Sequence, residues 1–168
     1  DPVSFVTKLP ENPVGTAALN EVRRYGADTS KVVIGGSRLG IYFFEKGTDI
    51  RPTNVVYDRE GSALALAKPE EFHWDEILKD TDIFYFSGVT PAVSENIAKA
   101  VLEALKYCKA HGIETVCDLN YRSKMWDTKK AQSVMSELMN YVTLCIANDE
   151  DFESSLGIHA YDGDISKG

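Results

Sequence analysis

The feature that most constrains the fold is an alternation of strand-like and helix-like segments over residues 82–157. The short apolar runs "DIFYF", "IETVCD" and "TLCIA" are separated by segments whose apolar residues recur at helical spacing. The clearest helix is "SENIAKAVLEALKYCKAHG", in which Ser94 is the predicted N-cap and Gly112 the terminator. This repetition predicts an α/β fold in which a parallel sheet is flanked by helices, with "DIFYF" as a strand buried on both faces.

Residues 1–62 add one βα unit and a run of short extended segments. "VSFVTKL" alternates like a strand, and Pro13 begins a helical stripe that ends at Gly26. The segments "KVVI", "LGIYFFEKG" and "TNVVYDREG" follow without a helix between them, which predicts a small antiparallel flap. A helical pattern resumes in "EEFHWDEILKD".

Composition restricts the partners of the chain. The 168 residues are 43% hydrophobic and carry a net charge of -8, so a packed core is expected and nucleic acid or an anionic membrane is disfavoured. Cys108, Cys117 and Cys145 lie far apart in apolar segments, which predicts buried free thiols in a reducing compartment. Because no apolar run is long enough to span a bilayer, we expect a cytoplasmic protein.

The polar residues that follow the predicted strands are the candidate site, because ligands of open parallel sheets collect at the carboxyl ends of the strands. "SGVTP" follows the first strand and contributes Val89 as an apolar wall. "DLNYR" follows the second and contributes Asn120 and Arg122. "NDED" follows the third, where Asn148 opens a helix whose first turn is acidic.

Each of these groups also has a purely structural interpretation. Asn148 and the acids after it are a normal helix start, and Arg122 could pair with an acid of its own loop. Tyr57 and Arg59 project together from one strand face, which is common on an exposed strand. The functional alternatives are an acidic group that holds Mg²⁺ through water near a nucleotide, and guanidinium groups that bind a carboxylate.

Several segments together resemble the ribokinase (PfkB-type) family of carbohydrate kinases, from Val3 to about Gly157. "VSFVTKLPENPVGTAALNEVRRYGADTS" resembles the family segment that follows its first glycine-rich motif. "LGIYFFE", "VVYDREGSALA", "FSGVTPAVS" and "CDLNYRSKMW" are most similar to the 2-keto-3-deoxygluconate kinases within it. The resemblance implies a ribokinase-like α/β fold with a small β lid.

The resemblance also implies a division of the chain. Residues 1–31 would be the first βα unit and residues 32–62 the β lid. Residues 63–157 would be the central βαβαβ portion, and residues 158–168 a polar tail.

The same resemblance implies roles for individual residues. Tyr42, Tyr57 and Arg59 would be lid residues that grip the sugar, while Val89 and Arg122 would contact it from the main sheet. Two arginines suit a substrate that bears a carboxylate, because each charge-assisted contact contributes about 1.5 to 3 kcal/mol. We therefore expect a sugar acid rather than a neutral sugar.

The implied reaction is ATP-dependent phosphorylation of 2-keto-3-deoxygluconate to its 6-phosphate, with Mg²⁺ as the metal. The family motif NxxE matches Asn148 to Asp151, with Asp in place of the final Glu. Asn120, Asn148 and Asp151 would contact the nucleotide or its phosphates, and Asp151 or Glu150 would hold the metal through water.

Two family segments are missing from these residues. The catalytic base is the Asp of a "GAGD" motif, which does not occur here, and the sugar-binding segment that precedes "VSFVTKL" in the family is also absent. We therefore expect the 168 residues to be a central part of the kinase and to be inactive alone. Another family member such as a fructokinase, or a non-catalytic sugar-acid-binding module, remains the alternative.

The apolar lid residues Ile41, Phe43 and Val55 suggest burial against a second subunit, as lids of this family often show. A homo-oligomer that binds a small sugar acid, but neither nucleic acid nor a membrane, is the expected assembly.

Overall fold

The computed structural model describes residues 2–159. The chain divides into two compact units, Asp1–Glu71 and Phe72–Gly168, and each is described by itself. Most of the predicted polar tail, residues 160–168, lies outside the described residues.

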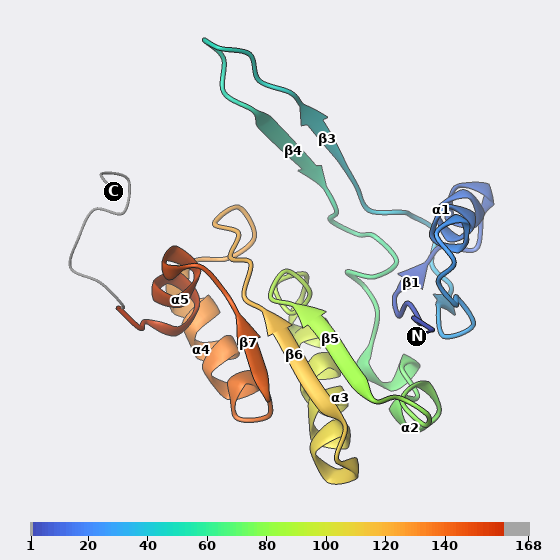
Figure 1. Ribbon diagram of the computed structural model, residues 1–168. Helices are drawn as coiled ribbons and strands as arrows, with labels where there is room; N and C mark the ends of the chain where they lie inside the picture. The colour runs from blue at the N-terminus through green and yellow to red at the C-terminus, as the bar shows by residue number, and fades with distance from the viewer. Residues whose placement is uncertain (1, 160–168) are drawn as a thin grey trace. The chain divides into compact units, whose positions relative to one another are not determined.

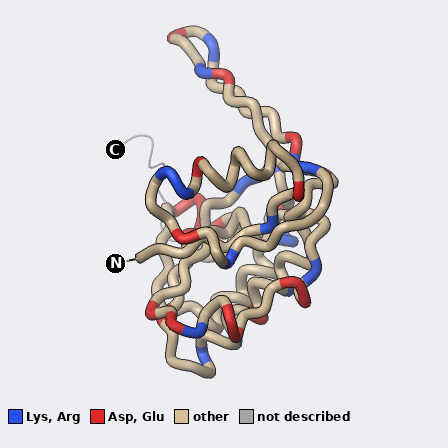
Figure 2. Tube along the Cα trace, turned by 90° about the vertical axis from the view of Figure 1, so that its right-hand side faces the viewer, with Lys and Arg blue, Asp and Glu red and all other residues tan. Residues whose placement is uncertain are grey.

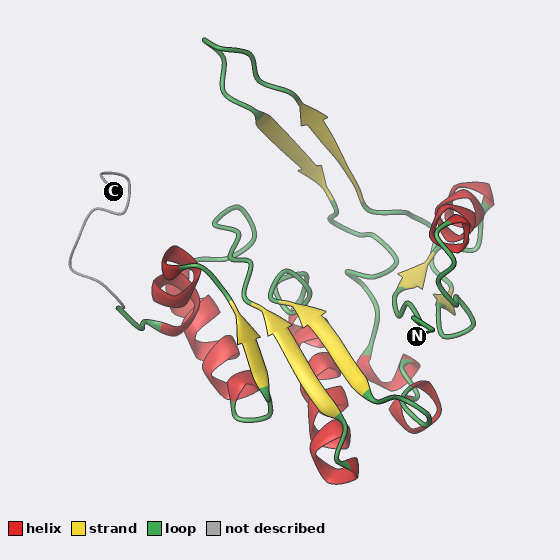
Figure 3. Ribbon diagram, in the orientation of Figure 1, coloured by secondary structure: helices red, strands yellow, loops and turns green. Residues whose placement is uncertain are grey.

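The second unit is built on a three-stranded parallel sheet, as the alternating pattern predicted. Its strand order is β5-β6-β7, and both neighbouring pairs run parallel. The strands are β5 (Ile83–Ser87), β6 (Glu114–Asp118) and β7 (Leu144–Ile146). The long helices α3 (Glu95–His111) and α4 (Thr128–Met139) lie along one face of this sheet (Figure 1 and Figure 3).

Local sequence signals explain where these helices begin and end. The Ser94 hydroxyl accepts a hydrogen bond from the backbone N–H of Ile97, and the Asp127 carboxylate accepts one from Lys130 at the start of α4. Gly112 ends α3 in the left-handed conformation, with φ of 71°, as its position predicted.

The core of the second unit lies between the sheet and these two helices. Fully buried side chains come from the inner faces of both helices and from the sheet: Ala104, Leu105, Cys108, Cys117, Ala131 and Met135. The opposite face of the sheet is exposed, since Ile83 and Tyr85 are 56% and 57% accessible. The prediction that β5 is buried on both faces is therefore wrong for this chain, because its helices cover one face only.

Shorter elements complete the second unit. Helix α5 (Asp149–Leu156) follows β7, and Asn148 caps it as predicted. The pattern "EEFHWDEILKD" does not form one helix. It contributes to two short helices: the 3₁₀ helix η1 (Pro69–Glu71), which ends the first unit, and α2 (Trp74–Ile77), which lies in the second. Phe72 stacks on Trp74 between them at 5.5 Å.

The first unit contains the expected βα unit. Helix α1 (Pro13–Arg24) is capped by Asn12, whose side chain accepts hydrogen bonds from the backbone N–H groups of Val14 and Gly15. The predicted strand before it is short: β1 covers Lys8–Leu9, and Ser4 adds one isolated bridge to Asp28. β2 (Val33–Ile34) pairs parallel with β1, so "KVVI" does not join the flap that the sequence predicted.

The predicted flap is a two-stranded antiparallel hairpin of β3 (Ile41–Glu45) and β4 (Asn54–Asp58) (Figure 1). Its register pairs Tyr42 with Tyr57 and Phe43 with Val56. Because side chains alternate along a strand, Val55 lies on the face of Tyr42 and Tyr57, opposite to Phe43.

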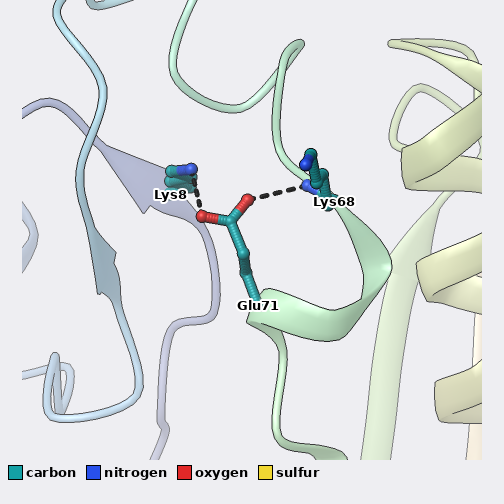
Figure 4. Close-up of polar contacts among 3 residues, drawn as sticks. All are labelled: Lys8, Lys68 and Glu71. Carbon is teal, nitrogen blue, oxygen red and sulfur yellow. Dashed lines mark hydrogen bonds and ion pairs between the residues drawn. The ribbon is translucent and has the colours of Figure 1, made fainter.

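A partly buried ion pair holds β1 to η1 within the first unit. Figure 4 shows the Glu71 carboxylate between the Lys8 ammonium and the backbone N–H of Lys68. The hydrogen bond from Lys8, followed by that from Lys68, lowers the pKa of Glu71 below its usual value.

Charge and cysteine usage agree with the composition. Over residues 2–159, Lys and Arg are interspersed with Asp and Glu along the chain (Figure 2). All three cysteines are free; Cys108 and Cys117 are buried, while Cys145 is half-buried. Burial raises the pKa of Cys108 to about 11.

Among the described residues, no helix is long and apolar enough to span a bilayer.

Candidate functional site

The hairpin brings three of the predicted site residues together. The ring centroids of Tyr42 and Tyr57 are 6.2 Å apart, and the guanidinium carbon of Arg59 lies 4.6 Å from the Tyr57 ring and 6.0 Å from the Tyr42 ring. Tyr42 is 57% exposed, whereas Tyr57 and Arg59 are half-buried. The prediction that Tyr57 and Arg59 share one face is confirmed. We call this group the lid cluster.

The lid cluster is chemically suited to bind a polar ring compound. Tyrosine offers an apolar ring and a hydroxyl that donates or accepts, and arginine adds a fixed fork of donors. Contact with two aromatic rings restricts the positions that the Arg59 guanidinium can take. A restricted guanidinium loses less conformational freedom when an anion binds.

The second unit brings together a separate group at the carboxyl ends of its strands. Gly88, directly after β5, lies so close to the loop after β6 that an added Cβ would be 2.1 Å from the Leu119 carbonyl oxygen. Its backbone N–H donates to the Asp118 carbonyl at 2.7 Å. Val89 follows and is half-buried.

Asn120 has an unusual backbone in this loop. Its φ is +40°, which is the one positive φ outside glycine among the described residues. Its side-chain Nδ2 donates to the Ser87 hydroxyl at 3.1 Å, so the ends of β5 and β6 are joined. Positive φ in a non-glycine residue stores strain that the surroundings must offset, and such residues gather at functional sites.

Arg122 lies two residues further on, at the exposed edge of the loop. Its Nη1 donates to the Tyr121 carbonyl at 3.0 Å, which turns the side chain back along its own loop. The Tyr121 hydroxyl donates to the Trp126 carbonyl at 3.1 Å and closes the loop.

The start of α5 supplies the oxygen donors. The Asn148 Oδ1 accepts from the backbone N–H of Asp151 at 2.8 Å, so the capping interpretation is correct. The Asp151 Oδ1 accepts from the backbone N–H of Tyr121 at 3.0 Å, and Glu150 is exposed. Among the described residues, no group of three or more His, Cys, Asp or Glu is gathered to hold a metal. Carboxylates can bind Mg²⁺ through its bound water, which the ion readily retains.

Two contacts were not predicted from the sequence: Ser87–Asn120 and Tyr121–Asp151. The sequence feature that could have predicted them is the order of the parallel strands, because the residues that follow β5, β6 and β7 lie at the same edge of the sheet. Arg59 and Arg122 belong to different units, so their convergence on one substrate stays a prediction.

The family pattern of the pfkB family carbohydrate kinases matches residues 1–165. The chain belongs to this family. It is 36% identical over 161 residues to the 2-dehydro-3-deoxygalactonokinase of Haloferax volcanii. The alignment covers 96% of this chain and 49% of that protein.

Solved structures of other kinases have a similar fold. The 2-dehydro-3-deoxygluconokinase of Thermotoga maritima is 46% identical, with a TM-score of 0.92 over 95% of this chain and 49% of its own. A sugar kinase of Pyrococcus horikoshii, solved in complex with ATP, has a TM-score of 0.80 over 95% of this chain and 52% of its own. At 20% identity it shows the fold alone. The predicted ribokinase-like α/β fold is confirmed.

The chain spans about half the length of the relatives it matches, which are kinases of 2-keto-3-deoxy sugar acids and other sugars. These residues therefore belong to a protein of the carbohydrate kinase class.

Proposed function

We propose that the full-length protein phosphorylates 2-keto-3-deoxygluconate on its terminal hydroxyl with ATP and gives the 6-phosphate. The observation that carries this proposal is the lid cluster, in which Arg59 lies against the rings of Tyr42 and Tyr57. A guanidinium group placed beside two aromatic rings suits a sugar whose end is a carboxylate. The similarity to kinases of two keto-deoxy sugar acids supports the same class of substrate.

In this proposal the two units supply different contacts. Tyr42 and Tyr57 contact the sugar chain, and Arg59 binds the carboxylate. From the sheet edge, Val89 gives an apolar wall and Arg122 a second cation. Two cations that bind the carboxylate fix one end of the sugar. The hydroxyl at the other end is thereby aligned with the nucleotide.

The α5 start and the Asn120 loop are proposed to serve the nucleotide. Asn120 and Asn148 contact its phosphates, and Asp151 or Glu150 holds Mg²⁺ through water. When bound, the metal neutralises charge on the transferred phosphoryl group. The carboxylate that takes the hydroxyl proton is not assigned to any of the 168 residues, so this chain alone should be inactive.

The experiment compares substrates and arginine variants in the full-length protein. Phosphorylation of ketodeoxygluconate should exceed that of fructose, and Arg59→Lys should raise KM for the sugar acid about tenfold, since lysine keeps the charge but loses the planar fork. Arg51→Lys is the matched control, because Arg51 lies in the same hairpin and pairs with Glu45 at 2.9 Å.

Three results would contradict the proposal. Equal turnover of fructose and ketodeoxygluconate would favour a neutral-sugar kinase, and binding of the sugar acid without turnover would favour a non-catalytic module. An unchanged KM in Arg59→Lys would remove Arg59 from the substrate site. Parallel assays with ketodeoxygalactonate measure which hydroxyl configuration the site prefers.

We also propose a homo-oligomer formed through the lid. On the hairpin face opposite the lid cluster, Phe43 and Val56 form a cross-strand pair and are 60% and 52% exposed. A second copy of the protein would bury this apolar surface. Phe43→Lys should therefore shift the full-length protein toward monomer in sedimentation experiments; an unchanged mass would exclude this surface as the interface.

A further inference from the structure

Two hydrogen bonds at the edge of the sheet in the second unit link the end of β5, the loop after β6 and the first turn of α5. Asn120 donates to Ser87 at the end of β5, and the next residue, Tyr121, donates its backbone N–H to Asp151 in α5. Two consecutive residues of the loop after β6 are thus anchored to the neighbouring elements on either side. Arg122, the proposed carboxylate ligand, is the residue that follows them.

Asp151 makes this link from the first turn of α5. Its backbone N–H donates to the cap residue Asn148 at 2.8 Å, while its Oδ1 accepts from Tyr121 at 3.0 Å. In a capping box, a Glu at this helix position reaches back toward the backbone of its own cap residue. Here the acid is one methylene shorter and instead bonds a loop that lies 30 residues earlier in the sequence.

The anchor acts on a loop whose backbone is already strained. Asn120 keeps a φ of +40°, a conformation that asparagine tolerates better than most residues, and relaxation of that angle would redirect the chain just before Arg122. A bond to the backbone of the next residue, Tyr121, opposes this relaxation. Because the Arg122 side chain is exposed and bonds only its own loop in the described contacts, the direction of the loop determines where the guanidinium can reach.

We propose that Asp151 is a positioning residue for substrate binding: through the Tyr121 amide it holds the loop that presents Arg122. This inference rests on the proposed function and adds to it a role for Asp151 on the sugar side, apart from any contact with the metal. The role requires an acceptor oxygen at this position but not a negative charge.

The test compares Asp151→Ala with Asp151→Asn in the full-length protein. Asparagine keeps the acceptor oxygen and removes the charge, whereas alanine removes both. Asp149→Asn is the control for a lost charge in the same helical turn. The first measurement is hydrogen exchange of the Tyr121 amide by NMR, which does not depend on activity, and the second is KM for ketodeoxygluconate.

We expect Asp151→Ala to expose the Tyr121 amide and to speed its exchange about tenfold or more, while Asp151→Asn and Asp149→Asn keep it protected. KM for the sugar acid should rise about tenfold in Asp151→Ala and stay within about threefold in the Asp149→Asn control.

Two outcomes would overturn the inference. Unchanged protection of Tyr121 in Asp151→Ala would show that the bond does not hold the loop. Equal loss of substrate affinity in Asp151→Asn and Asp151→Ala, together with a shift in Mg²⁺ dependence, would assign Asp151 to the metal instead. If the protein fails to phosphorylate any sugar acid, the proposed function fails, but the exchange measurement still reports whether Asp151 anchors the loop.

Discussion

Single residues at the sheet edge show how closely the loops of the second unit approach each other. Gly88 has no room for a side chain, because the Leu119 carbonyl occupies the space where a Cβ would lie. Asn120, two positions after β6, keeps a positive φ with its amide bonded to Ser87. Both features indicate that the loops after β5 and β6 are packed against one another and positioned as one surface.

We expect Gly88→Ala to lower the free energy of unfolding by about 1 to 3 kcal/mol, because the new methyl group would displace the Leu119 backbone. Urea unfolding of the full-length protein measures the effect. Gly112→Asn is a suitable control, since a Cβ there meets no atom within 4 Å and asparagine tolerates its positive φ. Equal loss in the two variants would show that the close approach at Gly88 is not limiting.

Glu71 should make the stability of the first unit depend on acidic pH. The Lys8 and Lys68 contacts lower its pKa in the folded chain, so their contribution is present above the unfolded pKa and is lost as the pH falls through the folded pKa. Glu71→Gln should cost about 1 kcal/mol at pH 7 and almost nothing at pH 2. Unfolding curves at the two pH values test this, and an equal cost at both would contradict it.

At the scale of elements, the start of α5 and the β3–β4 hairpin carry the candidate contacts. Helix α5 begins where the sequence predicted, and its cap orients Asp151 toward the neighbouring loop. The hairpin has one face with the lid cluster and the other with Phe43 and Val56. In our proposal both faces are used, so the hairpin should tolerate few substitutions that change its register.

Loss of the α5 cap should be measurable independently of activity. Asn148→Ala removes the acceptor for the Asp151 amide and should lower the free energy of unfolding by about 1 kcal/mol, while Asn148→Ser should nearly restore it. Thermal unfolding of the full-length protein provides the comparison. A destabilised serine variant would argue that the asparagine amide makes another essential contact.

At the scale of the whole molecule, one face of the β5–β6–β7 sheet is exposed in the part of the chain that the structure describes. Ile83, Tyr85, Leu144 and Ile146 are all exposed on it. Parallel sheets are normally covered on both faces, and the chain spans about half the length of its relatives.

The 168-residue chain should consequently bind a hydrophobic dye such as ANS more strongly, per mole, than the full-length protein. Leu144→Lys with Ile146→Lys should reduce this binding in the 168-residue chain, because the charges interrupt the apolar surface. Fluorescence titration measures the difference. Equal dye binding by the two lengths would show that the rest of the protein leaves this face open.

The sequence by itself determined the order of the elements in the second unit, since helical spacing, caps such as Ser94 and Asn148, and terminators such as Gly112 are local signals. It also determined that Tyr57 and Arg59 share a face, because strand alternation is local. Only the tertiary structure decided that β2 pairs with β1, that one face of β5 is open, and that Asp151 bonds Tyr121. Pairing and burial depend on contacts between residues far apart in the chain, which no local pattern encodes.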